Sequence, residues 1–140
     1  MGLDQYAYVA AKAGTYDEYY SDENYEKEDD DPTKFRKPTE LTYWRKHPNL
    51  QGWMERLWLS KNSSNPPLEN HNFNNIELEL SWEDLDMLEA DVKAGNLPIT
   101  GGFFFGENRD DEYKDQDLEF IKKAKAEVFL GLKVFYNSSW

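Results

Sequence analysis

The chain has 140 residues, no cysteine and a formal net charge of −12 at pH 7. This length suits one domain, and the absence of cysteine excludes disulfides, thiolate metal sites and a cysteine nucleophile. Nine acidic residues and one lysine between Asp17 and Asp31 contribute −8 (1 − 9), which leaves −4 for the rest. Direct nucleic-acid binding is therefore not expected, because it depends on basic patches.

No segment approaches the roughly 18–20 apolar residues that span a membrane. The N-terminus also lacks the basic and apolar regions of a secretory signal. We therefore expect no membrane association.

The N-terminal part combines an alternating segment with an acidic one. Residues Leu3–Lys12 alternate in character and predict a strand. Gly14–Lys37 is predicted to be an acidic loop insertion, with an interaction arm or a cation site as the alternatives. An EF-hand loop is excluded, because Lys27 and Thr33 stand where glycine and glutamate are required. As an arm, the segment would offer these residues to a partner: Asp22, Glu23, Tyr25, Asp29 and Asp30.

Two helices are predicted next. Residues 40–46 suggest a short helix that Pro48 interrupts, and a longer helix follows over Asn49–Lys61. An aromatic stripe at helical spacing, as in this longer helix, is typical of a hydrophobic core. The basic residues around the interruption are where we would first look for an anionic ligand: Arg45, Lys46, His47 and Arg56.

The second half alternates strands and helices. Asn62–Asn75 has the composition of a loop, and Ile76–Leu80 alternates as a half-buried strand does. Ser81 and Asp84 resemble a capping box, so a helix begins there, and Gly95 is expected to end it.

Three further elements complete the chain. Ile99–Glu107 holds three consecutive phenylalanines between glycines and predicts a short strand centred on Phe103–Phe105, with Phe104 on the opposite face from its neighbours. Asp110–Leu130 predicts a helix and Lys133–Trp140 a last strand. Together the elements predict a single α+β domain, in which a small mixed or antiparallel sheet of about four strands packs against three to four helices.

The sequence motifs of common catalytic sites are absent. Its glycines form neither a dinucleotide fingerprint nor a P-loop, and there is no Gly-x-Ser-x-Gly elbow. His47 and His71 lack metal-ligand spacing, and we expect each to be an ordinary surface or helix-capping residue. We predict no cofactor, no metal and no catalytic residue, so an enzyme is the less favoured interpretation.

A small-ligand site is nevertheless one hypothesis. Arg45 would bind an anion and aromatic rings would stack a base, as in a nucleotide-binding protein or a weak hydrolase. Asp4, Arg45 and Ser139 would then converge on one concave site; in the alternative, Asp4 and Arg45 pair inside a filled core. The complete set of ligand-binding candidates is Asp4, Tyr6, Trp44, Arg45, Gly102, Gly106, Ser138, Ser139 and Trp140.

Four separated motifs give the chain a wider resemblance. They are MGLDQY at the N-terminus, YWRK with the following WM, GFFFG, and the C-terminal YNSSW. In these motifs and their order the chain resembles a family of small proteins of tailed bacteriophages and prophages. The resemblance implies a phage accessory protein in the cytoplasm of the infected host cell. It favours a non-enzymatic binding protein that acts on host machinery, with a host protein as partner.

Overall fold

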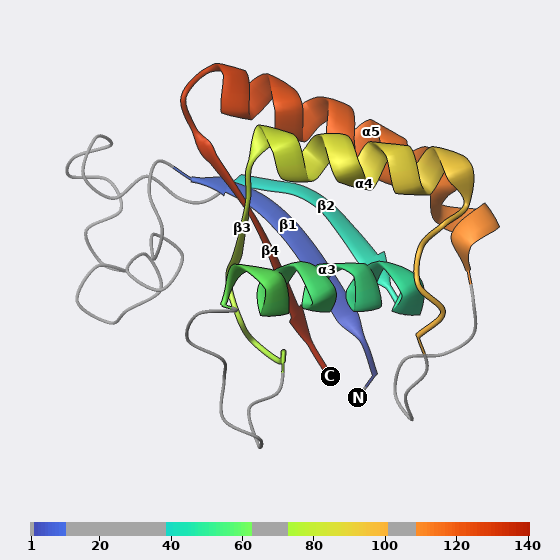
Figure 1. Ribbon diagram of the computed structural model, residues 1–140. Coiled ribbons are helices and arrows are strands. Elements are labelled where there is room, and N and C mark those ends of the chain that lie inside the picture. Colours follow the sequence, from blue (N-terminus) through green and yellow to red (C-terminus); the bar gives the residue numbers. More distant parts are fainter. Residues whose placement is uncertain (1, 11–38, 63–72, 101–108) are drawn as a thin grey trace.

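The computed structural model describes residues 2–10, 39–62, 73–100 and 109–140. Within these residues, four strands form an antiparallel sheet in the order β2-β1-β4-β3. Three helices accompany the sheet, which confirms the predicted α+β class (Figure 1). The elements are β1 (Asp4–Ala10), β2 (Thr39–Arg45), α3 (Pro48–Lys61), β3 (Leu78–Leu80), α4 (Trp82–Ala94), α5 (Asp110–Phe129) and β4 (Lys133–Ser139).

Strand alternation directs one face of the sheet toward all three helices. Ala7, Val134 and Tyr136 on this face are fully buried. Side chains from α3, α4 and α5 complete the same hydrophobic cluster. Figure 1 shows α3 crossing the sheet, while α4 and α5 lie side by side. On the opposite face, Tyr8 and Phe135 stack at a ring distance of 5.6 Å.

The predicted signals at the ends of α4 are confirmed. The Ser81 side chain accepts a hydrogen bond from the Asp84 N–H at 3.1 Å, and the Asp84 carboxylate accepts one from the Ser81 N–H at 2.9 Å. Gly95 ends the helix with a φ of +70°, a left-handed conformation that glycine adopts without strain. Pro48 lies in the first turn of α3, where its missing N–H breaks no intrahelical bond.

The helix predicted over residues 40–46 is wrong, because residues 40–45 belong to strand β2. The segment pairs with β1 from Asp4↔Arg45 to Val9↔Thr39, with a bulge near Thr42. Its threonines and aromatic residues favour a strand, and a short apolar run carries too few turns to identify a helix. Lys46, with a φ of +56°, follows the strand directly.

The remaining predicted elements agree in kind with the structure, within one or two residues at most ends. The acidic segment Gly14–Lys37 and the strand expected at Phe103–Phe105 lie outside the described residues. Both therefore remain predictions.

Candidate functional site

The predicted ligand-binding residues divide between the two faces of the sheet. Asp4 lies opposite Arg45 on β2 and opposite Ser139 on β4, so these three share the face away from the helices. Trp44 and Ser138 follow the other face into the core, where they are 0% and 1% exposed. Neighbours on one strand point to opposite sides, so Trp44 and Arg45 cannot line one site.

The remaining predicted residues are Trp140, which the structure describes, and several that lie outside the described residues. Trp140 is half-buried, and its backbone N–H donates to Asn74 Oδ1 at 3.2 Å. Gly102 and Gly106 lie outside the described residues, as do all five acidic-arm candidates and His71.

The residues on the open side form what we call the open-face patch: Asp4, Tyr6, Tyr43, Arg45 and Ser139. The Asp4 carboxylate organises it, because Oδ1 accepts from Arg45 Nη1 at 2.7 Å and from the Tyr43 hydroxyl at 2.5 Å. The Tyr6 and Tyr43 rings lie 5.3 Å apart. The hydrogen bond from Tyr43 and that from Arg45 lower the pKa of Asp4, while the bond to Asp4 raises the pKa of Tyr43.

His47 lies in the core, so the expectation of a surface residue is wrong, although it does occupy the N-cap position of α3. Its side chain is 0% exposed and makes no capping bond to α3. Nε2 lies 2.8 Å from Asp117 Oδ2, and Trp44 Nε1 donates to Asp117 Oδ1 at 2.8 Å. The Tyr113 ring stacks on the imidazole, with the ring centroids 4.8 Å apart. Asp117 therefore connects α5 to β2 and to the start of α3.

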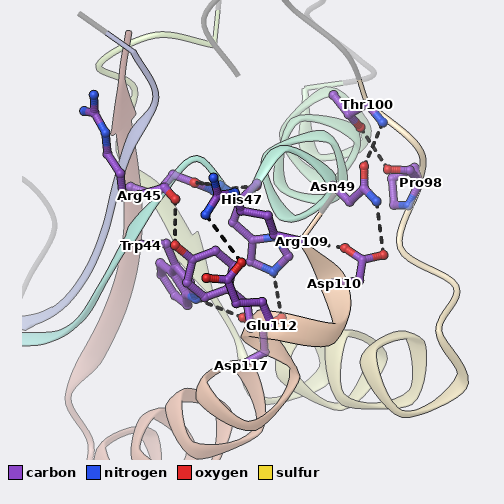
Figure 2. Close-up of polar contacts among 12 residues, drawn as sticks. Trp44, Arg45, His47, Asn49, Pro98, Thr100, Arg109, Asp110, Glu112 and Asp117 are labelled. Atoms are coloured by element: carbon purple, nitrogen blue, oxygen red, sulfur yellow. Dashed lines mark hydrogen bonds and ion pairs between the residues drawn. The ribbon is translucent and has the colours of Figure 1, made fainter. Parts of the chain in front are cut away.

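The other ring nitrogen of His47 has a different environment. Nδ1 is buried, makes no hydrogen bond and lies 4.0 Å from Asp110 Oδ1. Asp110 Oδ2 accepts from Asn49 Nδ2 at 3.0 Å. Figure 2 shows Asp110 and Asp117 on two sides of the imidazole. Burial raises the pKa of Asp117, although its hydrogen bond from His47 acts in the opposite direction.

A chain of buried amide and hydroxyl groups continues from His47 across the sheet. The Gln5 side chain accepts from the His47 backbone N–H at 2.8 Å and donates to the His47 carbonyl at 3.0 Å. It also donates to the Tyr136 hydroxyl at 2.9 Å. That hydroxyl donates to Gln51 Oε1, and Gln51 Nε2 donates to the Phe73 carbonyl at 3.3 Å. These polar groups therefore satisfy one another inside the core.

Sequence reasoning missed this network, although one signal for it exists. Asp117 occupies the same helical face as Phe120, Ile121 and Ala124, all of which are buried. An acidic residue within an apolar stripe is unusual unless a partner is buried with it. The partner itself could not be inferred, since His47 lies 70 residues away in the sequence.

The geometry limits the chemistry that the site can perform. A general base must reach its substrate within hydrogen-bond distance, and the His47 ring is enclosed. Among the described residues, no three His, Cys, Asp or Glu side chains form a group that could hold a metal ion.

No helix in the described part of the chain is long and apolar enough to cross a membrane. Comparisons with models of protein families, with curated proteins and with solved structures find no match.

Proposed function

We propose that the protein is a non-enzymatic phage accessory protein that binds a basic surface of a host protein through its open-face patch. One observation carries this proposal. Tyr43 is 42% exposed and the Arg45 side chain 44% exposed, on the sheet face that the described helices leave uncovered. Both are held in place by Asp4.

The composition of the patch supports a protein partner. Tyrosine and arginine are enriched among the residues that dominate binding energy at protein interfaces. Binding also costs less when a side chain already has its bound conformation. Asp4 restricts both Tyr43 and Arg45 by hydrogen bonds, so it acts here as a positioning residue.

The charge of the chain supports a basic partner. A net charge of −12 attracts positively charged surfaces and accelerates association with them. The host, and the phage origin of the protein, are inferred from the resemblance of the four sequence motifs. The acidic segment Gly14–Lys37 would add long-range attraction.

The test compares two matched double variants. Tyr43→Ala/Arg45→Ala removes an aromatic and a cationic group from the patch. Phe129→Ala/Lys122→Ala removes the same types of group from exposed positions of α5. A partner captured from host lysate is identified, purified and titrated against the native chain and both variants. We expect at least about tenfold weaker binding for the patch variant alone.

Two outcomes would contradict the proposal. One is equal affinity of the two double variants for the purified partner. The other is failure of the native chain to bind any captured protein after purification. Deletion of residues 15–32 tests the acidic segment separately, and we expect slower association whose rate depends less on salt.

A small-ligand site is the second candidate, and one observation favours it. The strand register brings Asp4, Arg45 and Ser139 to one face, as that hypothesis requires. A nucleotide bound by Arg45 would raise the melting temperature by mass action. A thermal-shift screen with nucleotides decides this. A rise that Arg45→Ala abolishes supports the site, and the absence of any rise excludes nucleotide binding at the concentrations used.

A further inference from the structure

The two outer strands of the described sheet are β2 and β3. An outer strand presents backbone N–H and C=O groups with which another chain can pair. Strand β3 has only three residues, and its Glu79 carbonyl accepts a hydrogen bond from Lys61 Nζ at 2.6 Å. Strand β2 has seven residues, so it is the longer edge and the better one for the addition of a further strand.

The strand register identifies which backbone groups of β2 face away from β1. The Lys46 N–H donates to the Leu3 carbonyl at 2.9 Å, which marks a hydrogen-bonded pair at the end of the ladder. Hydrogen-bonded and non-hydrogen-bonded pairs alternate along two antiparallel strands. Arg45 and Tyr43, at the alternate positions of β2, therefore direct their backbone groups away from β1.

Side chains of α5 occupy both of these outward carbonyl groups. The Tyr113 hydroxyl donates to the Arg45 carbonyl at 2.6 Å, and Gln116 Nε2 donates to the Tyr43 carbonyl at 2.6 Å. Gln116 Nε2 also donates to Thr42 Oγ1 at 2.9 Å, which fixes its amide along the strand. A strand that paired with β2 would need the same two carbonyls as acceptors, and the α5 side chains stand in its place.

We propose that Tyr113 and Gln116 close the β2 edge and so prevent a second copy of the chain from pairing with it. The threonine and aromatic residues of β2 favour a strand, so an open edge would pair readily. Two copies paired antiparallel about Tyr43 would set Glu40 of one opposite Lys46 of the other. Opposite charges stabilise such cross-strand pairs. This closure is independent of the proposed binding function.

The experiment compares the self-association of the native chain and of two double variants by sedimentation velocity, in salt that screens the net charge of −12. Tyr113→Phe/Gln116→Ala removes the donors of both edge bonds. Lys114→Ala/Asp115→Ala is the control, because it changes two exposed positions of the same helix without changing the net charge. We expect the first variant to form dimers at a concentration at least about tenfold lower than the native chain or the control.

A cross-link shows whether such a dimer uses the β2 edge. The chain has no cysteine, so Tyr43→Cys in the Tyr113→Phe/Gln116→Ala background supplies a single one. Residues of a hydrogen-bonded antiparallel pair have Cα atoms about 5.5 Å apart, which is within disulfide range. We expect Tyr43→Cys to form a disulfide dimer at least about tenfold faster than Phe129→Cys in the same background. Phe129 is exposed at the other end of α5.

Three results would overturn the proposal. One is self-association of the folded Tyr113→Phe/Gln116→Ala variant that is no stronger than that of the control. Another is an equal rate of disulfide formation for the two cysteine variants. The third is a native chain in which Tyr43→Cys cross-links as fast as it does in the double variant. If circular dichroism shows that the double variant does not fold, Tyr113→Phe and Gln116→Ala are measured singly, and each must self-associate more strongly than the control.

Discussion

Single residues fix the geometry of both polar regions. On the open face, one carboxylate, that of Asp4, holds Tyr43 and Arg45. In the core, one amide, that of Gln5, accepts and donates at the His47 backbone. The first group is partly hydrated and the second is sealed from water. Their loss should therefore have very different consequences for stability.

The first prediction concerns Asp4→Asn and its dependence on pH. The pKa of Asp4 is lowered in the folded state, so its contribution is present above the unfolded value of about 3.9 and disappears as pH falls through the folded value. Asp4→Asn should cost about 1 kcal/mol or less at pH 7, since the group is partly exposed. Urea denaturation should show this difference shrinking as pH falls below the unfolded value of about 3.9.

The control for this measurement is Asp115→Asn, which removes the same charge from an exposed position of α5. It should change the free energy of unfolding little at either pH. A loss of stability for Asp4→Asn that is the same at pH 7 and at the acid end would contradict the role assigned to the carboxylate.

The second prediction concerns Gln5→Leu, which preserves volume and removes the amide. The His47 backbone N–H would then be buried without an acceptor, and the bond from Gln5 to the Tyr136 hydroxyl would be lost. We expect a cost of about 3 kcal/mol in chemical denaturation. Gln116→Leu is the matched control, since Gln116 also makes two bonds, to Thr42 and Tyr43, but at a half-buried position. Its cost should stay near 1 kcal/mol, and equal costs would refute the argument.

At the scale of secondary structure, helix boundaries were readable from the sequence and strand pairing was not. Caps such as Ser81 and Gly95 act locally, so the sequence around them predicts α4 correctly. Residues 40–45 are a strand because β1 pairs with them, and no local signal identifies that partner. The alternating sequence correctly predicts β1 as a strand. The central place of β1 between β2 and β4, however, depends on contacts with segments 30 or more residues away.

The candidate site was predicted only in part, again because the sequence carries no local signal for contacts between distant segments. The small-ligand hypothesis requires Asp4, Arg45 and Ser139 to meet at one concave site; the strand register brings them to one face of the sheet, whereas Trp44 and Ser138 face the core. The error of grouping Trp44 with Arg45 follows from treating Arg45 as helical, since strand alternation separates the two. The His47–Asp117 contact joins segments 70 residues apart, which only the packing of α5 on the sheet brings together.

The third prediction concerns the close contact between α3 and the segment after α4. A Cβ at Gly52 would lie 1.8 Å from Thr100 Oγ1 and 2.9 Å from Thr100 Cβ. Thr100 is itself fixed, because its N–H donates to Asn49 Oδ1 at 2.9 Å. In an open helix, Gly→Ala gains about 1 kcal/mol. Here we expect Gly52→Ala to lose about 1–3 kcal/mol through overpacking.

Thermal denaturation of Gly52→Ala and of Gly52→Ala/Thr100→Gly separates these two effects. Removing the Thr100 side chain should restore part of the lost stability, because it opens the space that the new methyl group requires. A stabilised single variant, or a double variant whose loss is the sum of two independent losses, would show that the contact is not tight.

For the whole molecule, charge is the dominant feature. Several of the described ion pairs lie at the surface, as in Arg109–Glu112 and Lys93–Glu89, and such exposed pairs contribute little. The net charge of −12 and the isoelectric point near 4.5 instead imply net repulsion among acidic groups at neutral pH, with most of the excess charge between Asp17 and Asp31. Salt screens both effects, so its net influence on stability reports which of them is larger.

The fourth prediction follows from that balance. At pH 8, raising NaCl from 10 to 200 mM shortens the screening length from about 30 Å to less than 10 Å, which weakens repulsion between distant acidic groups more than attraction within close pairs. We expect the melting temperature to rise by roughly 2–4 °C, equivalent to about 1 kcal/mol for a chain of this size. At pH 4.5, where the net charge is near zero, the same salt change should have almost no effect.

A melting temperature that falls with salt at pH 8 would mean that ion pairs outweigh the repulsion. The acidic excess would then act mainly on the rate of association with a basic partner, which stopped-flow measurements over the same salt range would detect.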